Sequence, residues 1–166
     1  YYPYRVWQSR VSKKVRPIFL VYSNGIYSLY EYVFQDLGIY NSLVLVKHRN
    51  YSIEDTSIEM SDLMDVATQI STFVSEPQIS FPQADSFERV INICELLGSQ
   101  ELSRDDVTEE YAFDIRQTNF YTDAARYLGL VDKKYDGRKP VYSLSEYGQR
   151  LMKLNYKQRQ LAFCKS

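Results

Sequence analysis

The sequence predicts an α+β protein: an antiparallel β-hairpin or sheet fragment with flanking helices, followed by a helical unit with a hairpin of its own. Two observations carry this prediction. In the first half, two apolar runs rich in aromatic and β-branched residues flank Asn24-Gly25. In the second half, three segments with helical periodicity precede a short basic hairpin. A period of two predicts strands, and apolar residues three or four positions apart predict helices.

The first elements are a basic helix and a β-hairpin. Residues 5–14, RVWQSRVSKK, have helical character and a basic face. The runs 17–23 and 26–34 then flank Asn24-Gly25. This dipeptide suits a type I′ turn, because that turn needs positive φ at both central residues. The sequence therefore predicts two antiparallel strands that meet at this turn.

Two further strands and a helix complete the first half. We expect a third strand at 42–47 and a short fourth strand at 50–53. Residues 61–74 place six apolar side chains on one helical face, namely Leu63, Val66, Ala67, Ile70, Phe73 and Val74.

A linker then divides the chain. The segment 75–84, SEPQISFPQA, contains two prolines and lacks clean periodicity. We therefore predict a first domain at 1–75, a linker at 76–84 and a second domain at 85–166.

The second half opens with two short helices. Asp85 and Glu88 have the spacing of a capping box. They precede an apolar stripe of Phe87, Val90, Ile91, Cys94 and Leu97, which ends at Gly98. Ser103 and Asp106 indicate the start of a second helix that ends near Tyr111.

A third helix, a hairpin and two last helices follow. The third helix is predicted from about Arg116 to Leu128, before a glycine that suits a helix end. Basic residues around Asp136-Gly137 predict a hairpin with strands near 130–134 and 139–143. A helix after Ser143, with Glu146 as its box partner, and another over 156–164 complete the chain. Three helices followed by a hairpin are the order of a winged helix-turn-helix domain.

Charge is strongly segregated along the chain. Residues 1–16 carry five basic side chains and no acidic one, and residues 116–166 carry 11 basic against four acidic. Residues 31–110 carry 16 acidic side chains against four basic. Two basic terminal segments around an acidic middle segment suit a protein that binds a polyanion through those basic segments. Ordinary solvated surface charge is the alternative.

The third helix and the hairpin supply the candidate DNA-binding residues. Tyr121, Ala124, Ala125 and Leu128 share one side of the helix and predict its packed face. The candidates are Arg116, Gln117, Asn119, Asp123 and Arg126 on the helix, with Lys133, Lys134, Arg138 and Lys139 in the hairpin. Arg, Asn and Asp can read base edges, and the lysines suit phosphates. A solvated helix face with surface ion pairs is the alternative for Arg116 and Arg126.

The combined pattern resembles the C-terminal part of type II restriction endonucleases of the PD-(D/E)XK superfamily. The segments that carry it are YRVWQSRVSKK, PIFLVYSNGIYSLYEYVF, FPQADSFERVINICELL, RQTNFYTDAARYLGLV and YSLSEYG. The resemblance implies that 5–14 is the helix after the catalytic motif and that 17–34 are the strands after it. It also implies that 85–166 is an attached winged-helix domain.

The resemblance further implies a Mg²⁺-dependent parent endonuclease whose catalytic residues lie upstream of this chain. No Glu-x-Lys occurs, and the only Asp-x-Lys, Asp132-Lys133-Lys134, falls in the predicted hairpin. We therefore expect no catalytic residue, metal site or cofactor in this chain. Gln8 and Arg10 lie on the helix after the motif, so either could support catalysis by orienting a phosphate or the catalytic lysine. A structural or solvated role is the alternative for both.

Composition sets the remaining expectations. The chain starts with Tyr1, so we expect a processed chain or a piece of a longer protein. One histidine, His48, and two distant cysteines, Cys94 and Cys164, argue against a zinc site or a disulfide framework. No stretch approaches a membrane span. We expect a cytoplasmic protein whose partner is double-stranded DNA, with a homodimer left open.

Two other functions remain open. The chain could be a non-catalytic transcriptional regulator in which residues 1–75 sense a signal or dimerise. It could also be a protein-interaction module that uses the acidic 31–110 surface, with the winged helix in a structural role.

Overall fold

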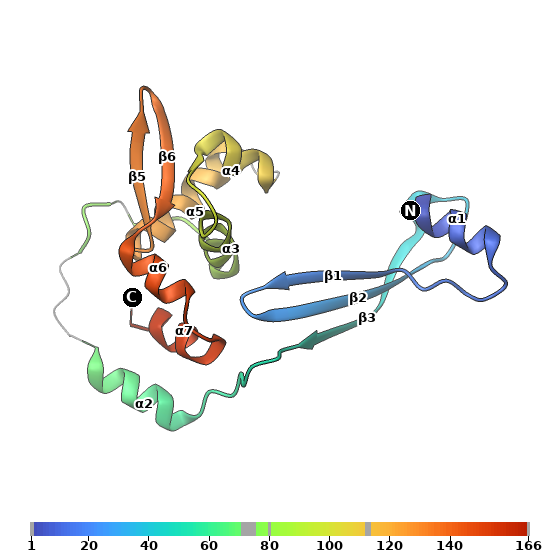
Figure 1. Ribbon diagram of the computed structural model, residues 1–166, viewed down its shortest axis with the longest axis horizontal. Helices are drawn as coiled ribbons and strands as arrows, with labels where there is room; N and C mark the ends of the chain where they lie inside the picture. The colour runs from blue at the N-terminus through green and yellow to red at the C-terminus, as the bar shows by residue number, and fades with distance from the viewer. Residues whose placement is uncertain (1, 71–75, 80, 112–113, 166) are drawn as a thin grey trace. The chain divides into compact units, whose positions relative to one another are not determined.

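The structure is a computed structural model that describes residues 2–70, 76–79, 81–111 and 114–165. It confirms the predicted α+β class: the chain forms two compact units, Tyr1–Ile53 and Glu54–Ser166, each with a three-stranded antiparallel sheet (Figure 1). The units divide ahead of the predicted linker at 76–84. The helix predicted at 61–74 therefore groups with the second unit.

The first unit consists of one helix and one sheet. Its elements are α1 (Tyr2–Arg10), β1 (Ile18–Ser23), β2 (Ile26–Phe34), the short 3-10 helix η1 (Tyr40–Ser42) and β3 (Leu43–Tyr51). The strand order is β1-β2-β3, and both pairs are antiparallel. Asn24 and Gly25 have φ angles of 51° and 78°, which confirms the predicted turn.

Two details of the first unit differ from the prediction. The strands predicted at 42–47 and 50–53 are one strand, β3, whose alternation is broken by a bulge opposite Glu31 and Tyr32. The helix predicted at 5–14 ends at Arg10, because the Gln8 side chain holds a loop there. Its Oε1 accepts a hydrogen bond from the Val15 amide at 2.8 Å, and its Nε2 donates to the carbonyl of residue 13 at 3.3 Å.

The second unit is mainly helical. Its elements are α2 (Met60–Gln69), α3 (Phe87–Leu97), β4 (Leu102–Ser103), α4 (Arg104–Glu110), α5 (Ile115–Tyr127), β5 (Val131–Asp136), β6 (Lys139–Leu144), α6 (Glu146–Met152) and α7 (Tyr156–Phe163). The strand order is β4-β6-β5, with both pairs antiparallel. Among the described helices, none is long and apolar enough to cross a lipid bilayer.

One hydrophobic core holds this unit together. The helices α3 and α4 each pack against α5, and α5 also packs on β5. The side chains at the centre are at most 4 % exposed and include Val90, Ile91, Ile93, Cys94, Leu97, Val107, Tyr121, Ala124, Ala125, Leu130, Val131, Tyr142 and Leu151. Burial raises the pKa of the Cys94 thiol to about 12, which keeps it protonated at neutral pH.

Helix α2 begins close to the predicted start. Its one buried residue is Val66, while Leu63 and Met64 are exposed, so the apolar face is only partly covered. Phe73 and Val74, which the prediction placed on that face, lie outside the described residues.

The N-cap residue is the predicted one in one helix and a different residue in two others. Ser103 and Asp106 form the predicted capping box of α4. Ser86, not Asp85, caps α3, because the Asp85 carboxylate accepts a hydrogen bond from the Tyr121 hydroxyl instead. That bond holds the pKa of Asp85 below its ordinary value. Ser145 caps α6 in place of the predicted residue 143, which is still part of β6.

A close backbone contact fixes α6 against the loop between α5 and β5. The Ser145 amide donates to the Leu130 carbonyl at 2.9 Å, and the Ser145 hydroxyl donates to the Gly129 carbonyl at 2.6 Å. Gly148 then lies so close that a Cβ there would be 2.1 Å from the Leu130 oxygen. Only glycine fits at this position.

Candidate nucleic-acid interface

Helix α5 carries the candidate residues, and its N-terminal cap and its packed face hold it in place. Asp114 caps its N-terminus, and Gln117 completes the capping box: the Gln117 amide donates to Asp114 Oδ1 at 2.8 Å, and the Asp114 amide donates to Gln117 Oε1 at 3.4 Å. Gln117 was predicted to contact DNA. Its side chain takes part in the cap of α5, and its contact with DNA stays a prediction.

The packed face of α5 matches the prediction and extends beyond it. Tyr121, Ala124 and Ala125 are buried as expected. Thr118 and Thr122 are also buried, and the Thr122 hydroxyl donates to the carbonyl of Thr118 at 2.8 Å. Because these hydroxyls are satisfied within the fold, polar threonine can line a core face that the apolar pattern did not mark.

The outer face of α5 carries one exposed cation and one ion pair. Arg116 is exposed, and its guanidinium lies 5.2 Å from the centre of the Phe120 ring. Asn119 is half-buried. Asp123 and Arg126 bind each other across one turn, with 2.7 Å between Oδ1 and Nη1. This pair is the surface ion pair that the sequence left open for Arg126.

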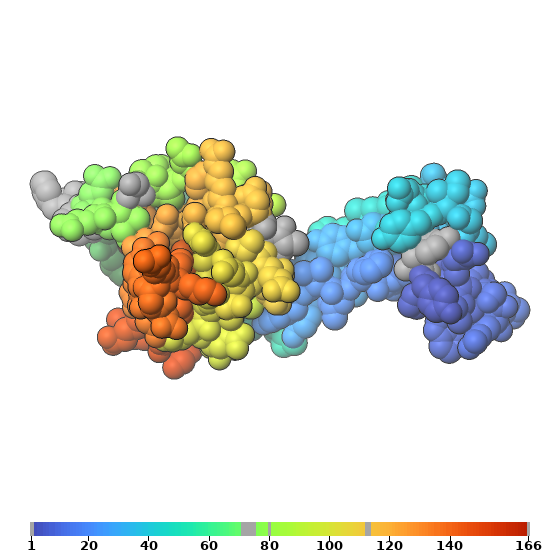
Figure 2. Space-filling model, turned by 90° about the horizontal axis from the view of Figure 1, so that it is seen from above, coloured from blue at the N-terminus to red at the C-terminus, as the bar shows by residue number. Residues whose placement is uncertain are grey.

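The hairpin β5–β6 extends away from the helices (Figure 1), and its tip is exposed on the face seen in Figure 2. Gly137 has a φ of 60° at the first position of the turn, as a type II′ turn requires. Its neighbours Arg138 and Lys139 are exposed.

The two lysines of β5 are already engaged within the fold. The Lys133 ammonium lies 5.4 Å from the ring centre of Tyr135 and 5.8 Å from that of Tyr142. Lys134 forms an ion pair with Glu101. Arg116, Arg138 and Lys139 are exposed and form no ion pair among the described residues, although Arg116 lies against the Phe120 ring.

The candidates for catalytic support lie in the first unit. Gln8 stabilises the loop after α1, which is the structural alternative considered for it. Arg10 is the last residue of α1 and is exposed. Asp132, with the two lysines after it, lies on β5 as expected from the sequence.

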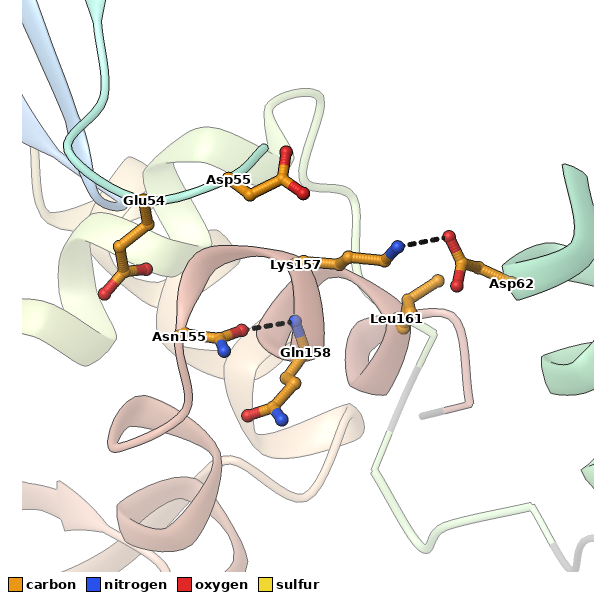
Figure 3. Close-up of a pocket in the computed structure, with 7 residues that line it drawn as sticks. All are labelled: Glu54, Asp55, Asp62, Asn155, Lys157, Gln158 and Leu161. Carbon is orange, nitrogen blue, oxygen red and sulfur yellow. Dashed lines mark hydrogen bonds and ion pairs between the residues drawn. The ribbon is translucent and has the colours of Figure 1, made fainter. Parts of the chain in front are cut away.

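Acidic side chains gather at a hollow beside α7 (Figure 3). The hollow has a volume of about 630 Å³ and is lined by Glu54, Asp55, Asp62, Asn155, Lys157, Gln158 and Leu161. Asp62 forms an ion pair with Lys157 at 2.6 Å, and Glu54 accepts a hydrogen bond from the Tyr156 amide at 2.7 Å. Asp55 accepts from the Ser57 amide at 2.9 Å.

These carboxylates stabilise the fold. Lys157 holds the pKa of Asp62 below its ordinary value, and the backbone amide of Ser57 does the same for Asp55. Glu54 satisfies an amide in the first turn of α7, where negative charge is favoured. In the described parts of the chain, no group of three acidic, His or Cys residues is arranged to hold a metal ion.

Comparisons with known proteins find two matching families. Residues 1–52 match the model described as "Domain of unknown function (DUF6997)", and residues 89–166 match the model described as "Domain of unknown function (DUF7226)". No curated protein and no solved structure matches the chain. The two matched segments correspond closely to the sheet of the first unit and the core of the second.

Proposed function

We propose that the second unit is a winged-helix domain that binds double-stranded DNA through α5 and the hairpin β5–β6. The order of elements carries this proposal. Three helices, with β4 between the first two, precede a hairpin that pairs with β4 in the order β4-β6-β5. In helix-turn-helix proteins the last helix of such a set lies in the major groove.

The positions of the unpaired charges support the same function. Arg116 lies in the first turn of α5, and recognition helices contact base edges with their N-terminal residues. Arginine pairs with guanine, and Asn119 could pair with adenine. Arg138 and Lys139 at the hairpin tip suit phosphates on either side of the groove.

We also propose that the chain is part of a Mg²⁺-dependent type II restriction endonuclease in the cytoplasm. A helix followed by an antiparallel hairpin in residues 2–34 is the arrangement that the resemblance implies. The catalytic carboxylates and lysine would then belong to another part of the parent protein. The test is cleavage of plasmid DNA by the full encoded protein, with Mg²⁺ and with EDTA.

Duplex binding is tested on this chain by fluorescence anisotropy with a labelled random-sequence 20-base-pair duplex. The double variant Arg138→Ala/Lys139→Ala should lower the salt slope by about 1.8, since each phosphate contact contributes about 0.9. The matched control Arg150→Ala/Lys153→Ala removes the same charge from α6 and its C-cap, and it should leave the slope unchanged. Equal slopes for the two double variants would contradict the proposal.

Arg116→Ala tests base readout once a preferred sequence has been selected from a random pool. Loss of a bidentate base contact should weaken binding to that sequence by about 1–3 kcal/mol and relax the preference at one base pair. An unchanged preference would show that α5 is not the recognition helix.

A protein-interaction module is the second candidate, and the internal pairing of α5 favours it. Asp123 with Arg126, and Gln117 with the helix cap, use side chains that a DNA-reading helix would keep available. If the chain bound duplex DNA at 50 mM salt no more tightly than an unrelated acidic protein does, this candidate would be favoured over DNA binding. A regulator without nuclease activity would instead bind duplex DNA while its full encoded protein leaves plasmid intact.

A further inference from the structure

One face of the sheet in the first unit combines a row of tyrosines with a column of cations. Residues opposite each other in an antiparallel pair share a face, so the strand register defines this surface. Its three rows across β1, β2 and β3 are Tyr22-Tyr27-Tyr51, Leu20-Leu29-Arg49 and Ile18-Glu31-Lys47. We call this surface the tyrosine face.

The aromatic row is exposed. Tyr22 is 58 % and Tyr51 is 51 % exposed, and Tyr27 between them is half-buried. The ring centres of Tyr22 and Tyr27 are 4.7 Å apart. Exposed aromatic rings side by side on a sheet are the usual platform on which unpaired bases stack.

The cations run along β3 beside that row. Lys47 and Arg49 are alternate residues of one strand, so they lie about 6.8 Å apart on the same face. Neither has an ion-pair partner among the described residues. They line a hollow of about 340 Å³ together with Arg16, Ile18, Leu29, Glu31 and Tyr51.

The one acidic residue of the hollow is already neutralised. Arg16 binds Glu31 with two hydrogen bonds of 2.6 Å, from Nε to Oε1 and from Nη2 to Oε2. This guanidinium holds the pKa of Glu31 below its ordinary value. The charge that remains beside the tyrosines is therefore positive, and it suits a polyanion.

The opposite face of the sheet is built differently. Tyr4 of α1 stacks on Phe34, with 4.8 Å between ring centres, so the helix covers part of that face. Tyr30 stacks on His48, and Phe19 packs edge-on against Tyr32. The tyrosine face differs in that its aromatic rings lie beside Lys47 and Arg49, which form no ion pair among the described residues.

We propose that the tyrosine face binds single-stranded DNA, with bases stacked on Tyr22, Tyr27 and Tyr51 and phosphates bound by Lys47 and Arg49. Stacking recognises any base because each base has a π-face, so little sequence preference is expected. This site is separate from α5 and the β5–β6 hairpin, and it does not depend on duplex binding by the second unit.

The test is anisotropy of the full chain with labelled oligothymidylate of 12 nucleotides. Tyr51→Ala should weaken binding about 5- to 150-fold, the equivalent of one stacked base, and Tyr51→Phe should retain it. Tyr2→Ala is the matched control, because Tyr2 is 77 % exposed on α1 and lies outside the tyrosine face. Lys47→Ala/Arg49→Ala should lower the salt slope by about 1.4.

A second readout keeps the proposal testable if Tyr51→Ala fails to fold. Photocrosslinking with 5-iododeoxyuridine in the same oligonucleotide should label Tyr22, Tyr27 or Tyr51. Crosslinks confined to the second unit would overturn the proposal. The proposal would also be overturned if Arg138→Ala/Lys139→Ala lowered the affinity for the single strand and Lys47→Ala/Arg49→Ala did not. That result would leave duplex binding by the second unit intact, so the two proposals can fail separately.

Other occupants of this face give distinct results. If a second copy of the chain covered this face, analytical ultracentrifugation would show a dimer, and Leu20→Lys would dissociate it. Such a chain would not bind oligothymidylate. An RNA site would bind oligouridylate and not oligothymidylate. Either result would overturn the proposal.

Discussion

The Gly148→Ala substitution tests how closely α6 must approach the loop before β5. The added Cβ would lie 2.1 Å from the Leu130 oxygen and 3.0 Å from its carbonyl carbon, both backbone atoms. A normal contact needs more than 3 Å, so α6 or the loop must move by about 1 Å. Movement of α6 would also strain the 2.9 Å hydrogen bond from the Ser145 amide to the Leu130 carbonyl.

The expected cost follows from these contacts. Overpacking costs about 1–3 kcal/mol, and a weakened hydrogen bond adds about 0.5–1.5 kcal/mol. Alanine recovers about 1 kcal/mol in a helix. We therefore expect the free energy of unfolding of the second unit to fall by roughly 1–3 kcal/mol. With a urea m-value of about 2 kcal/mol/M, the midpoint should fall by about 0.5–1.5 M.

The assay is urea unfolding followed by circular dichroism at 222 nm, since most of the helical residues belong to the second unit. Gly137→Ala is the matched control: its φ is 60°, yet no atom lies within 4 Å of the added Cβ. It carries only the backbone cost of a positive φ, which is at least about 1 kcal/mol. If Gly148→Ala were no more destabilising than Gly137→Ala, the close contact would not constrain the fold.

Three further predictions follow from burial and ion pairs. Cys164 is exposed, whereas Cys94 is buried and its pKa is about 12, so Ellman's reagent should modify one thiol per native chain and two after unfolding. Lys157→Ala should speed amide hydrogen exchange in α2, because it removes the ion pair to Asp62; Lys153→Ala should not. The folded-state pKa of Asp85 is lowered, so its stabilisation is complete above its unfolded pKa of about 3.9 and is lost as the pH falls through the folded value. Urea midpoints of the native chain and Asp85→Asn should therefore differ at pH 7 and converge as the pH falls below the folded-state pKa of Asp85; a constant difference would contradict the assigned bond.

Local signals in the sequence predict most elements, because they depend on neighbouring residues. Asn24-Gly25 predicts its turn through backbone sterics, and Ser103 with Asp106 predicts its cap through a three-residue spacing. The shifted caps have a tertiary cause. The Tyr121 hydroxyl binds Asp85 from a helix 36 residues away, and no local pattern contains that contact.

The candidate site was predicted less completely for the same reason. The exposed face of α5 follows from periodicity, but the partners of its polar residues do not. Lys134 pairs with Glu101, which is 33 residues away in the sequence. The cations of β3 were not singled out as a site, because the register that aligns Lys47 and Arg49 with a row of tyrosines is set by strand pairing. A strand-pairing pattern built outward from the Asn24-Gly25 turn could have found them.

The two edge strands of the first sheet, β1 and β3, differ in charge. A strand with a partner on one side only leaves backbone amides and carbonyls on the other, where a further strand can add. β1, with the sequence IFLVYS, carries no charge, and five of its six residues are exposed. β3 carries Lys47 and Arg49. If a second copy of the chain paired along β3, the cations of the two copies would repel each other and oppose the pairing. Fibrillar self-association of the free chain should therefore begin along β1, and a lysine at Val21 should suppress it.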